Sequence, residues 1–282
     1  MRRRILGGML GFFLAGASPL LARAQTSLPP LRIAVHPYAS TLALIAMHRP
    51  LTQYLSARLG RPVEFYTAPN FEAFVESLQA GEYDIAIAPP HFAVLAMDDQ
   101  YWPVLHYAAR LEPILVVRND SSLQRIEDLR GKRIAMADRS ALIRLASVKW
   151  LADQGLRSER DYSIVERPSH AASVSSALAG DVDAGLSTAS ALRQMPENVR
   201  QRVRSLPLPL SLPHLFTLLH RRNGEALRRQ LRSVLMDFQE TPEGQKFLLE
   251  SGFKGYDEIS DADIKAVRPY AELYRRTLAG GR

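Results

Sequence analysis

The sequence predicts an α/β protein of two similar lobes that are joined by two crossing segments. Three observations support this fold class: short apolar runs alternate with segments of helical periodicity, the alternation occurs twice, and two further apolar segments connect the halves. In both halves a helical segment ends on Ala-Gly, two residues intervene, and an Asp opens a short apolar run, at 78–86 and again at 177–185. Two repeated β-α-β-α-β units indicate two α/β lobes.

The first half begins with an apolar run that predicts a buried strand at 31–35, stopped by His36-Pro37. A helix is expected from Ser40 or Thr41 to Gly60, because a hydroxyl residue can cap its start and glycine can close its end. The unit continues with a strand at 63–66, a helix at 71–80, and a strand at 83–88 that stops before Pro89-Pro90.

The second half follows the same order. It predicts a strand at 132–137, a helix at 140–154, a strand at 162–165, a helix from Ser169 or His170 to 178, and a strand at 182–186. The segment 113–117 leads out of the first half and 213–219 leads back, so the C-terminal helices from Gly224 onward are expected to pack on the first lobe. We expect lobe 1 to comprise 29–117 and 208–282, and lobe 2 to comprise 118–207.

Two crossing segments imply a hinge with a cleft facing it. In parallel α/β sheets, ligands lie outside the carboxyl ends of the strands and against helix N-termini. Six segments of the chain meet this description: 36–41, 88–92, 137–141, 187–188, the helix start at Ser169-His170, and the returning segment around His214. The sequence therefore predicts a cleft lined by peptide amides, hydroxyls and histidines.

The N-terminus has the three parts of a secretory signal peptide: a basic start at 1–4, an apolar run at 5–21, and an Ala-x-Ala cleavage site at 22–24. The arginines leave twin-arginine export open beside the general route. The sequence has no cysteine, which excludes disulfides, thiolate sites and a lipid-modified N-terminal Cys. We expect a soluble periplasmic protein that is not a lipoprotein.

Charge and motifs exclude several functions. The formal net charge is +7, but four basic residues and no acidic residue precede Gln25, so the chain beyond residue 24 carries only +3. It shows no basic cluster interleaved with aromatics, which argues against a nucleic-acid partner. It has no G-x-S-x-G, H-E-x-x-H, P-loop or dinucleotide glycine motif, so we expect neither an enzyme nor a cofactor.

Four histidines fall on the expected cleft segments, namely His36, His91, His170 and His214. Imidazole is a frequent zinc ligand, so a metal site has to be considered. No two of these histidines have the short spacing of paired ligands, and no histidine-rich loop is present. We therefore expect no metal.

Several motifs occur in a fixed order from Leu31 to Val267: Pro37-Tyr38, 49–55 with 59–63, 80–86 with Pro90, 116–121, 128–133, 169–172, 180–184, 242–244, 252–253 and 260–263. In this order the chain resembles the type II periplasmic solute-binding proteins, specifically the phosphate/phosphite/phosphonate-binding family of ABC-transporter receptors. The resemblance implies a monomeric receptor that captures a small, oxyanionic ligand between two lobes for an ABC permease. A ligand-sensing accessory protein for a histidine-kinase ectodomain is the alternative.

The resemblance also implies site residues. Tyr38 and His170 match ligand-contacting positions of the family, and Phe92 stands where relatives often carry tyrosine. The family's Ser-Thr-Ser-Gly-like run is replaced by Asp138-Arg139-Ser140-Ala141, which supplies one hydroxyl and no glycine, so the ligand stays open. The expected ligand-binding residues are Tyr38, Ser40, Thr41, Pro90, His91, Phe92, Ser140, Ala141, Arg144, His170 and Ser187. Packing is the alternative for Tyr38 and Phe92, and a solvated side chain for Arg144.

Overall fold

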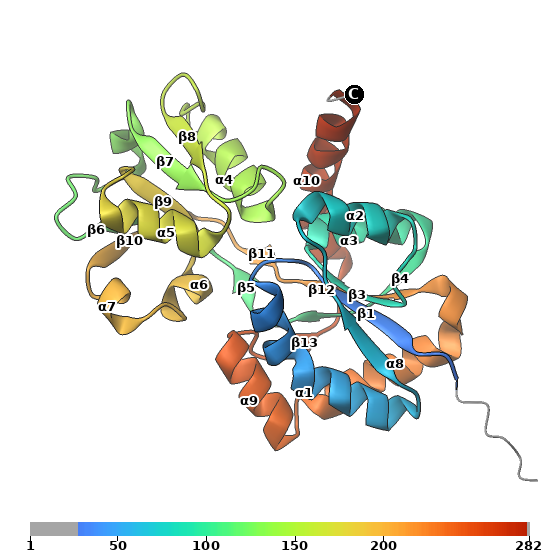
Figure 1. The fold of residues 1–282 in the computed structure, drawn as a ribbon. Helices are drawn as coiled ribbons and strands as arrows, with labels where there is room; N and C mark the ends of the chain where they lie inside the picture. Colours follow the sequence, from blue (N-terminus) through green and yellow to red (C-terminus); the bar gives the residue numbers. More distant parts are fainter. Residues whose placement is uncertain (1–27, 281–282) are drawn as a thin grey trace, which may run out of the picture.

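The computed structural model describes residues 28–280, with side chains as far as Arg276; the expected signal peptide at 1–24 lies outside the described residues. The chain forms two α/β lobes, each built on its own sheet (Figure 1). The first sheet has the strand order β13-β4-β12-β3-β1-β2, and the second has the order β10-β6-β9-β7-β8. The predicted two-lobed α/β architecture is confirmed.

The first lobe contains the expected parallel strands β1 (Leu31–Val35), β2 (Val63–Tyr66) and β3 (Ile85–Ala88). Helices α1 (Thr41–Leu59) and α2 (Phe71–Gln79) connect them, and α1 ends at Gly60 in the left-handed conformation. The antiparallel strands β12 (Phe216–His220), β4 (Tyr101–Tyr107) and β13 (Tyr256–Asp257) complete the sheet. Helix α3 (Pro90–Asp99) and strand β4 were not anticipated, because Pro89-Pro90 was interpreted only as the end of a strand.

The second lobe repeats this arrangement. Strands β7 (Arg133–Met136), β8 (Ser163–Glu166) and β9 (Ala184–Thr188) are parallel, and they alternate with α4 (Leu142–Asp153) and α5 (His170–Ala179). Short helices α6 (Ala189–Arg193) and α7 (Glu197–Arg200) precede β10 (Val203–Pro207), which pairs with β6 (Pro113–Arg118). A 3-10 helix, η1 (Ile126–Leu129), lies before β7, and η2 (Arg221–Asn223) follows β12 in the first lobe.

The repeated Ala-Gly-x-x-Asp motif has the same structural role in both lobes. Gly81 and Gly180 take positive φ, of 70° and 83°, as the chain leaves the helix. The carboxylate of Asp84 accepts a hydrogen bond from the Arg32 N–H at 2.9 Å, and that of Asp183 accepts one from the Arg133 N–H at 2.8 Å. Each Asp thus ties the third strand of its lobe to the first strand.

The two crossing segments pair with each other between the lobes. Strands β5 (Arg110–Leu111) and β11 (Leu212–Pro213) form a small antiparallel ribbon there (Figure 1). Strand β6 follows this crossing and lies in the second sheet beside β9, just as β12 lies beside β3 in the first. The crossing therefore precedes β6, which corrects the expected boundary after Val117; the division into lobes by residue range otherwise stays a prediction.

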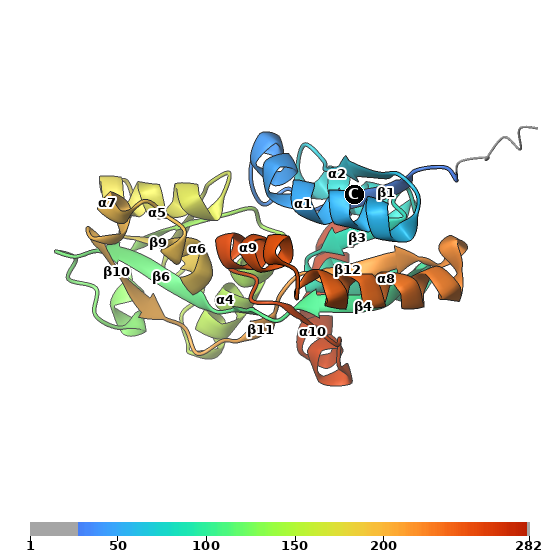
Figure 2. The same cartoon turned by 90° about the horizontal axis from the view of Figure 1, so that it is seen from below.

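The C-terminal helices pack as expected on the first lobe, with one addition. Helices α8 (Gly224–Phe238) and α9 (Pro242–Ser251) contact α1 (Figure 2). Helix α10 (Asp261–Gly280) contacts α3 of the first lobe (Figure 1) and also α4 of the second. Its residues Val267, Ala271 and Tyr274 share one apolar cluster with Leu142 and Ala146 of α4. Within residues 28–280, no helix combines the length and apolar character that a membrane crossing requires.

Candidate functional site

The largest described hollow is a cavity of about 700 Å³ between the lobes, at the carboxyl ends of their parallel strands. Every one of the six segments expected to form the cleft contributes to its wall. The lining residues from those segments are His36, Pro37, Tyr38, Ala39, Ser40, Thr41, Pro89, Pro90, Ala141, Thr188, Ser169, His170 and His214. The sequence therefore located the cleft correctly, because the ends of buried strands can be read from apolar runs that stop at Pro, Gly or polar residues.

Further lining residues were not anticipated. The loop after β2 contributes Ala68 and Pro69, and Phe71 follows at the start of α2. The chain around α6 contributes Gln194 and Met195. Other apolar side chains reach the cavity from helices and from the crossing, namely Met47, Leu111, Leu142, Ile143, Leu215 and Phe253. An apolar residue in a loop or a first helical turn looks like a core residue in the sequence, so no signal separated these from packing residues.

Four helices of ten or more residues begin at the cavity: α1, α3, α4 and α5. The first N–H groups of a helix have no partner within the helix, and they carry the positive end of its dipole. Side chains satisfy only part of them here. The Ser40 hydroxyl accepts from the Ala43 N–H, and the Ser169 hydroxyl accepts from the Ala172 N–H, whereas α3 and α4 have no side-chain cap. The arrangement favours an anion.

Three lining histidines have hydrogen-bonding capacity that the protein does not use. The Nδ1 atoms of His36, His170 and His214 are buried and have no hydrogen-bond partner among the described residues. His36 and His214 are 6% and 8% exposed, and their rings are held by aromatic contacts with Phe71 at 4.6 Å and Phe253 at 5.0 Å between centroids. An unsatisfied buried polar group costs about 1–3 kcal/mol, so a ligand that reaches one of these rings can recover part of that cost.

These imidazoles are neutral in the free protein. Burial, together with the neighbouring His91, His170 and His214, lowers the pKa of His36 to about 3. Burial lowers the pKa of His214 to about 3 as well, and that of His170 to about 4, although the His170 ring remains partly accessible from the cleft. A neutral imidazole offers one N–H donor and one acceptor, so the three rings can donate to a ligand without carrying charge.

Formal charge is absent from the cavity wall. Among the side chains described, those of residues 28–276, no Asp, Glu, Lys or Arg lines the cavity. Two charged residues close in sequence to the lining residue Ala141 have partners outside the cavity. The Asp138 carboxylate accepts hydrogen bonds from the backbone N–H and hydroxyl of Ser140, and Arg144 pairs with Glu166. Among the described lining residues, positive charge is therefore supplied by helix N-termini and not by cationic side chains.

Two expected site residues, His91 and Phe92, do not line the cavity. Helix α3 begins at Pro90, which turns the next two side chains away from the cleft. His91 is completely buried, and its Nε2 donates to the Ser140 carbonyl at 2.9 Å. Phe92 packs against His91 and against Tyr274 of α10, at centroid distances of 4.0 and 4.8 Å. His91 thus contributes to the contact between lobes.

Ser140, Arg144 and Ser187 also lie outside the cavity wall. The Ser140 hydroxyl donates to Asp138 within its own turn. The Arg144 guanidinium donates to the Ala137 carbonyl at 2.7 Å and to the Glu166 carboxylate at 2.8 Å, so it joins the ends of β7 and β8. The Ser187 hydroxyl is buried in β9 without a partner among the described residues. Of the expected set, Tyr38, Ser40, Thr41, Pro90, Ala141 and His170 line the cavity.

Contacts between the lobes lie on both sides of the cavity. On one side the His91 imidazole of α3 reaches the Ser140 carbonyl of the second lobe. On the other side the Gln194 amide after α6 donates to the Ser251 carbonyl at the end of α9, at 2.5 Å. Relative movement of the lobes has to change both contacts.

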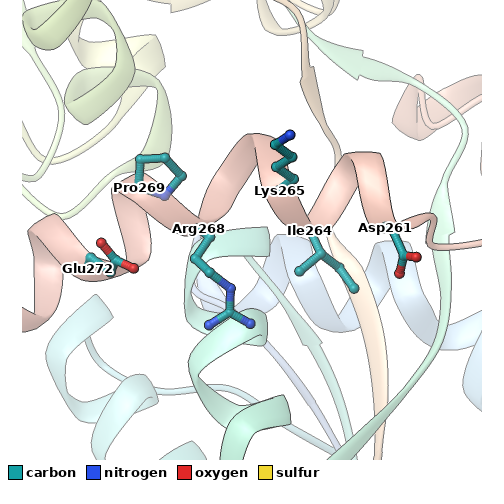
Figure 3. Close-up of a pocket in the computed structure, with 6 residues that line it drawn as sticks. All are labelled: Asp261, Ile264, Lys265, Arg268, Pro269 and Glu272. Carbon is teal, nitrogen blue, oxygen red and sulfur yellow. The ribbon is translucent and has the colours of Figure 1, made fainter.

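A second hollow runs along α10 and is lined by Asp261, Ile264, Lys265, Arg268, Pro269 and Glu272 (Figure 3). All six residues belong to one helix, and Arg268 already pairs with Asp98 of α3 at 3.2 Å. Among the described residues, no second element contributes to the wall of this hollow. Within the described residues, no cluster of three or more His, Cys, Asp or Glu could hold a metal ion.

The uncapped start of α4 allows a stability test. Ala141 is the N-cap residue, with the extended conformation (φ −62°, ψ 128°) in which a hydroxyl can accept from the first turn. We expect Ala141→Ser to raise the free energy of unfolding by about 1 kcal/mol, the usual contribution of such a cap. Denaturant titration of this variant beside Ser169→Ala, which removes the existing cap of α5, should give shifts of opposite sign. A loss of stability in Ala141→Ser would contradict the cap geometry.

Comparisons with known proteins agree with this architecture. The family model for the periplasmic substrate-binding protein of phosphonate ABC transporters matches residues 33–264. PhnD1 of Prochlorococcus marinus in complex with methylphosphonate superposes with a TM-score of 0.77 at 15% identity, over 87% of this chain and 98% of that one. A binding-protein component of an ABC phosphonate transporter from Pseudomonas aeruginosa gives 0.72 at 15% identity, over 90% and 89%.

A protein of Xanthomonas citri bound to chloride ion also gives a TM-score of 0.72, at 18% identity, over 89% of this chain and 99% of that one. At these identities the solved structures establish the fold, which is the type II periplasmic-binding fold, and leave the ligand of this chain open.

Proposed function

The chain belongs to the periplasmic substrate-binding proteins of phosphonate ABC transporters, and from that premise we propose that its cleft captures a small oxyanion for import. Members of this family are receptors and not enzymes. They bind their ligand in the periplasm and work with the membrane permease of an ABC transporter. This favours the transport receptor over the sensory alternative. The signal peptide at 1–24, release without a lipid anchor and a monomeric state complete the proposal.

The observation that carries the oxyanion proposal is the convergence of four helix N-termini and three unpartnered imidazoles on one cavity that lacks acidic side chains. Backbone N–H groups and imidazole N–H groups donate, and an oxyanion accepts several such bonds at once. A cation would meet the positive ends of the helices and find no carboxylate among the described lining residues.

A thermal-unfolding screen tests this proposal. Phosphate, phosphonates, sulfonates and carboxylates are compared with zinc, each added to the purified protein. We expect at least one oxyanion to stabilise the protein, by about 2.7 kcal/mol when it is present at ~100 times its Kd, and zinc to have no effect. Stabilisation by zinc alone, reversed by a chelator, would replace the oxyanion by a metal.

A further inference from the structure

The wall of the cavity combines two properties: its described lining residues include no charged side chain, and much of the wall is apolar. We propose that the ligand is an organic oxyanion that carries one negative charge on an apolar body, rather than a small dianion such as inorganic phosphate or methylphosphonate. This inference rests on the proposed oxyanion function and specifies the class of ligand.

The charge of the wall limits the charge of the ligand. A second negative charge would have to leave water without meeting any Lys or Arg among the described lining residues. The imidazoles do not supply this cation, because the low pKa of His36 has His170 and His214 among its causes, so charging one ring opposes charging the next. Each helix N-terminus carries only about half a positive charge, and that charge acts only over the first turn.

The size of the cavity points the same way. A volume of about 700 Å³ lies in the middle of the range that organic ligands of drug size occupy. A bare phosphate group would contact one part of the wall and leave the remainder filled with water. A ligand with an aliphatic or aromatic body would fill it.

Apolar side chains from both lobes face this volume. Met47 and Phe71 line it from the first lobe, and Leu142, Ile143 and Met195 line it from the second. Leu142 and Ile143 stand in the first turn of α4, so an anionic group near that helix start has apolar surface beside it. Each CH₂ group of the ligand that is buried there should tighten binding about fourfold.

A set of six ligands separates head-group charge from body size. The affinities of methylphosphonate, hexylphosphonate, methanesulfonate, hexanesulfonate, acetate and hexanoate are measured by calorimetry with the purified protein at pH 9, where the phosphonates are mostly doubly charged. We expect the six-carbon member of each pair to bind at least ten times more tightly, and a singly charged head group to bind more tightly than the phosphonate of the same length. Methylphosphonate binding more tightly than every longer or singly charged ligand would overturn this inference while supporting the proposed function. Failure of all six to bind would overturn both.

A variant tests the charge argument directly. Ala171 lines the cavity at an exposed position in the first turn of α5, where an arginine can be accommodated. We expect Ala171→Arg to raise the affinity for hexylphosphonate relative to hexanesulfonate about tenfold, since it brings a cation to the second charge. Ser175→Arg is the matched control, because Ser175 is exposed on the same helix but lies outside the cavity wall. An unchanged ratio in Ala171→Arg, with folding confirmed, would contradict a limit set by missing charge.

Discussion

Acidification from pH 6.5 to pH 5 is expected to lower the free energy of unfolding by several kcal/mol. His36, His48, His91 and His214 are buried, and burial lowers the pKa of each to about 3 or 4 from an ordinary value of 6.5. Between these values the unfolded chain binds protons that the folded chain does not, so stability is complete above pH 6.5 and is lost as the pH falls below it. Each such histidine contributes up to about 1.4 kcal/mol per pH unit.

Urea titrations at pH 7.5, 6.5, 5.5 and 5.0 measure this slope. Four histidines acting together would remove on the order of 5 kcal/mol per pH unit, which is comparable with the whole stability of many domains. The variant His48→Leu serves as the internal standard, because His48 packs in the first lobe against Phe65 and Phe247 and does not line the cavity. For this variant, the slope of the free energy of unfolding against pH should be smaller by the contribution of one histidine, about 1.4 kcal/mol per pH unit at most. A free energy of unfolding that is constant from pH 7.5 to 5.0 would contradict the burial of neutral imidazoles.

Much of the fold could be predicted because its signals are local. Short apolar runs at 31–35 and 85–88 predict strands from a few neighbouring residues. The Ala-Gly-x-x-Asp repeat likewise predicts the end of a helix and the start of the next strand. Which of the two sheets β6 joins cannot be predicted from the residues of β6 and its neighbours along the chain. It depends on pairing with β9 and β10, which follow about 70 and 90 residues later, and the sequence of β6 alone is equally suited to either sheet.

The candidate site was predictable in its place but not in all of its residues. The residues that follow a buried strand lie at the cleft, in a loop or at the first position of the next helix. Tyr38, Thr41 and His170 line the cavity for this reason. Whether a residue of the first helical turn faces the cleft depends on the rotation of that turn and on partners elsewhere. Arg144 turns away because Glu166, at the end of the neighbouring strand, pairs with it.

The substitution His170→Ala is expected to weaken binding of the tightest oxyanion roughly 10–150-fold. A hydrogen bond from the imidazole to a charged ligand contributes about 1.5–3 kcal/mol, and each ~1.4 kcal/mol is a factor of ten in Kd. The residue lines the cavity at the first turn of α5. Calorimetric titration of the variant with that oxyanion measures the loss.

Stability separates this role from a structural one. The cap of α5 is the Ser169 hydroxyl, which accepts from the Ala172 N–H at 3.1 Å, so His170 is not needed to hold the helix start. His170→Ala should therefore not lower the free energy of unfolding, because it removes a buried polar atom that has no partner among the described residues. His220→Ala is the control with the opposite expected result. His220 lies outside the cavity wall, and its Nε2 is 3.0 Å from Gln100 Oε1. Its loss should reduce the free energy of unfolding and leave the affinity for the ligand unchanged. Unchanged affinity together with reduced stability in His170→Ala would make this histidine a packing residue, and the anion would then have to be held by helix N–H groups and by His36 and His214.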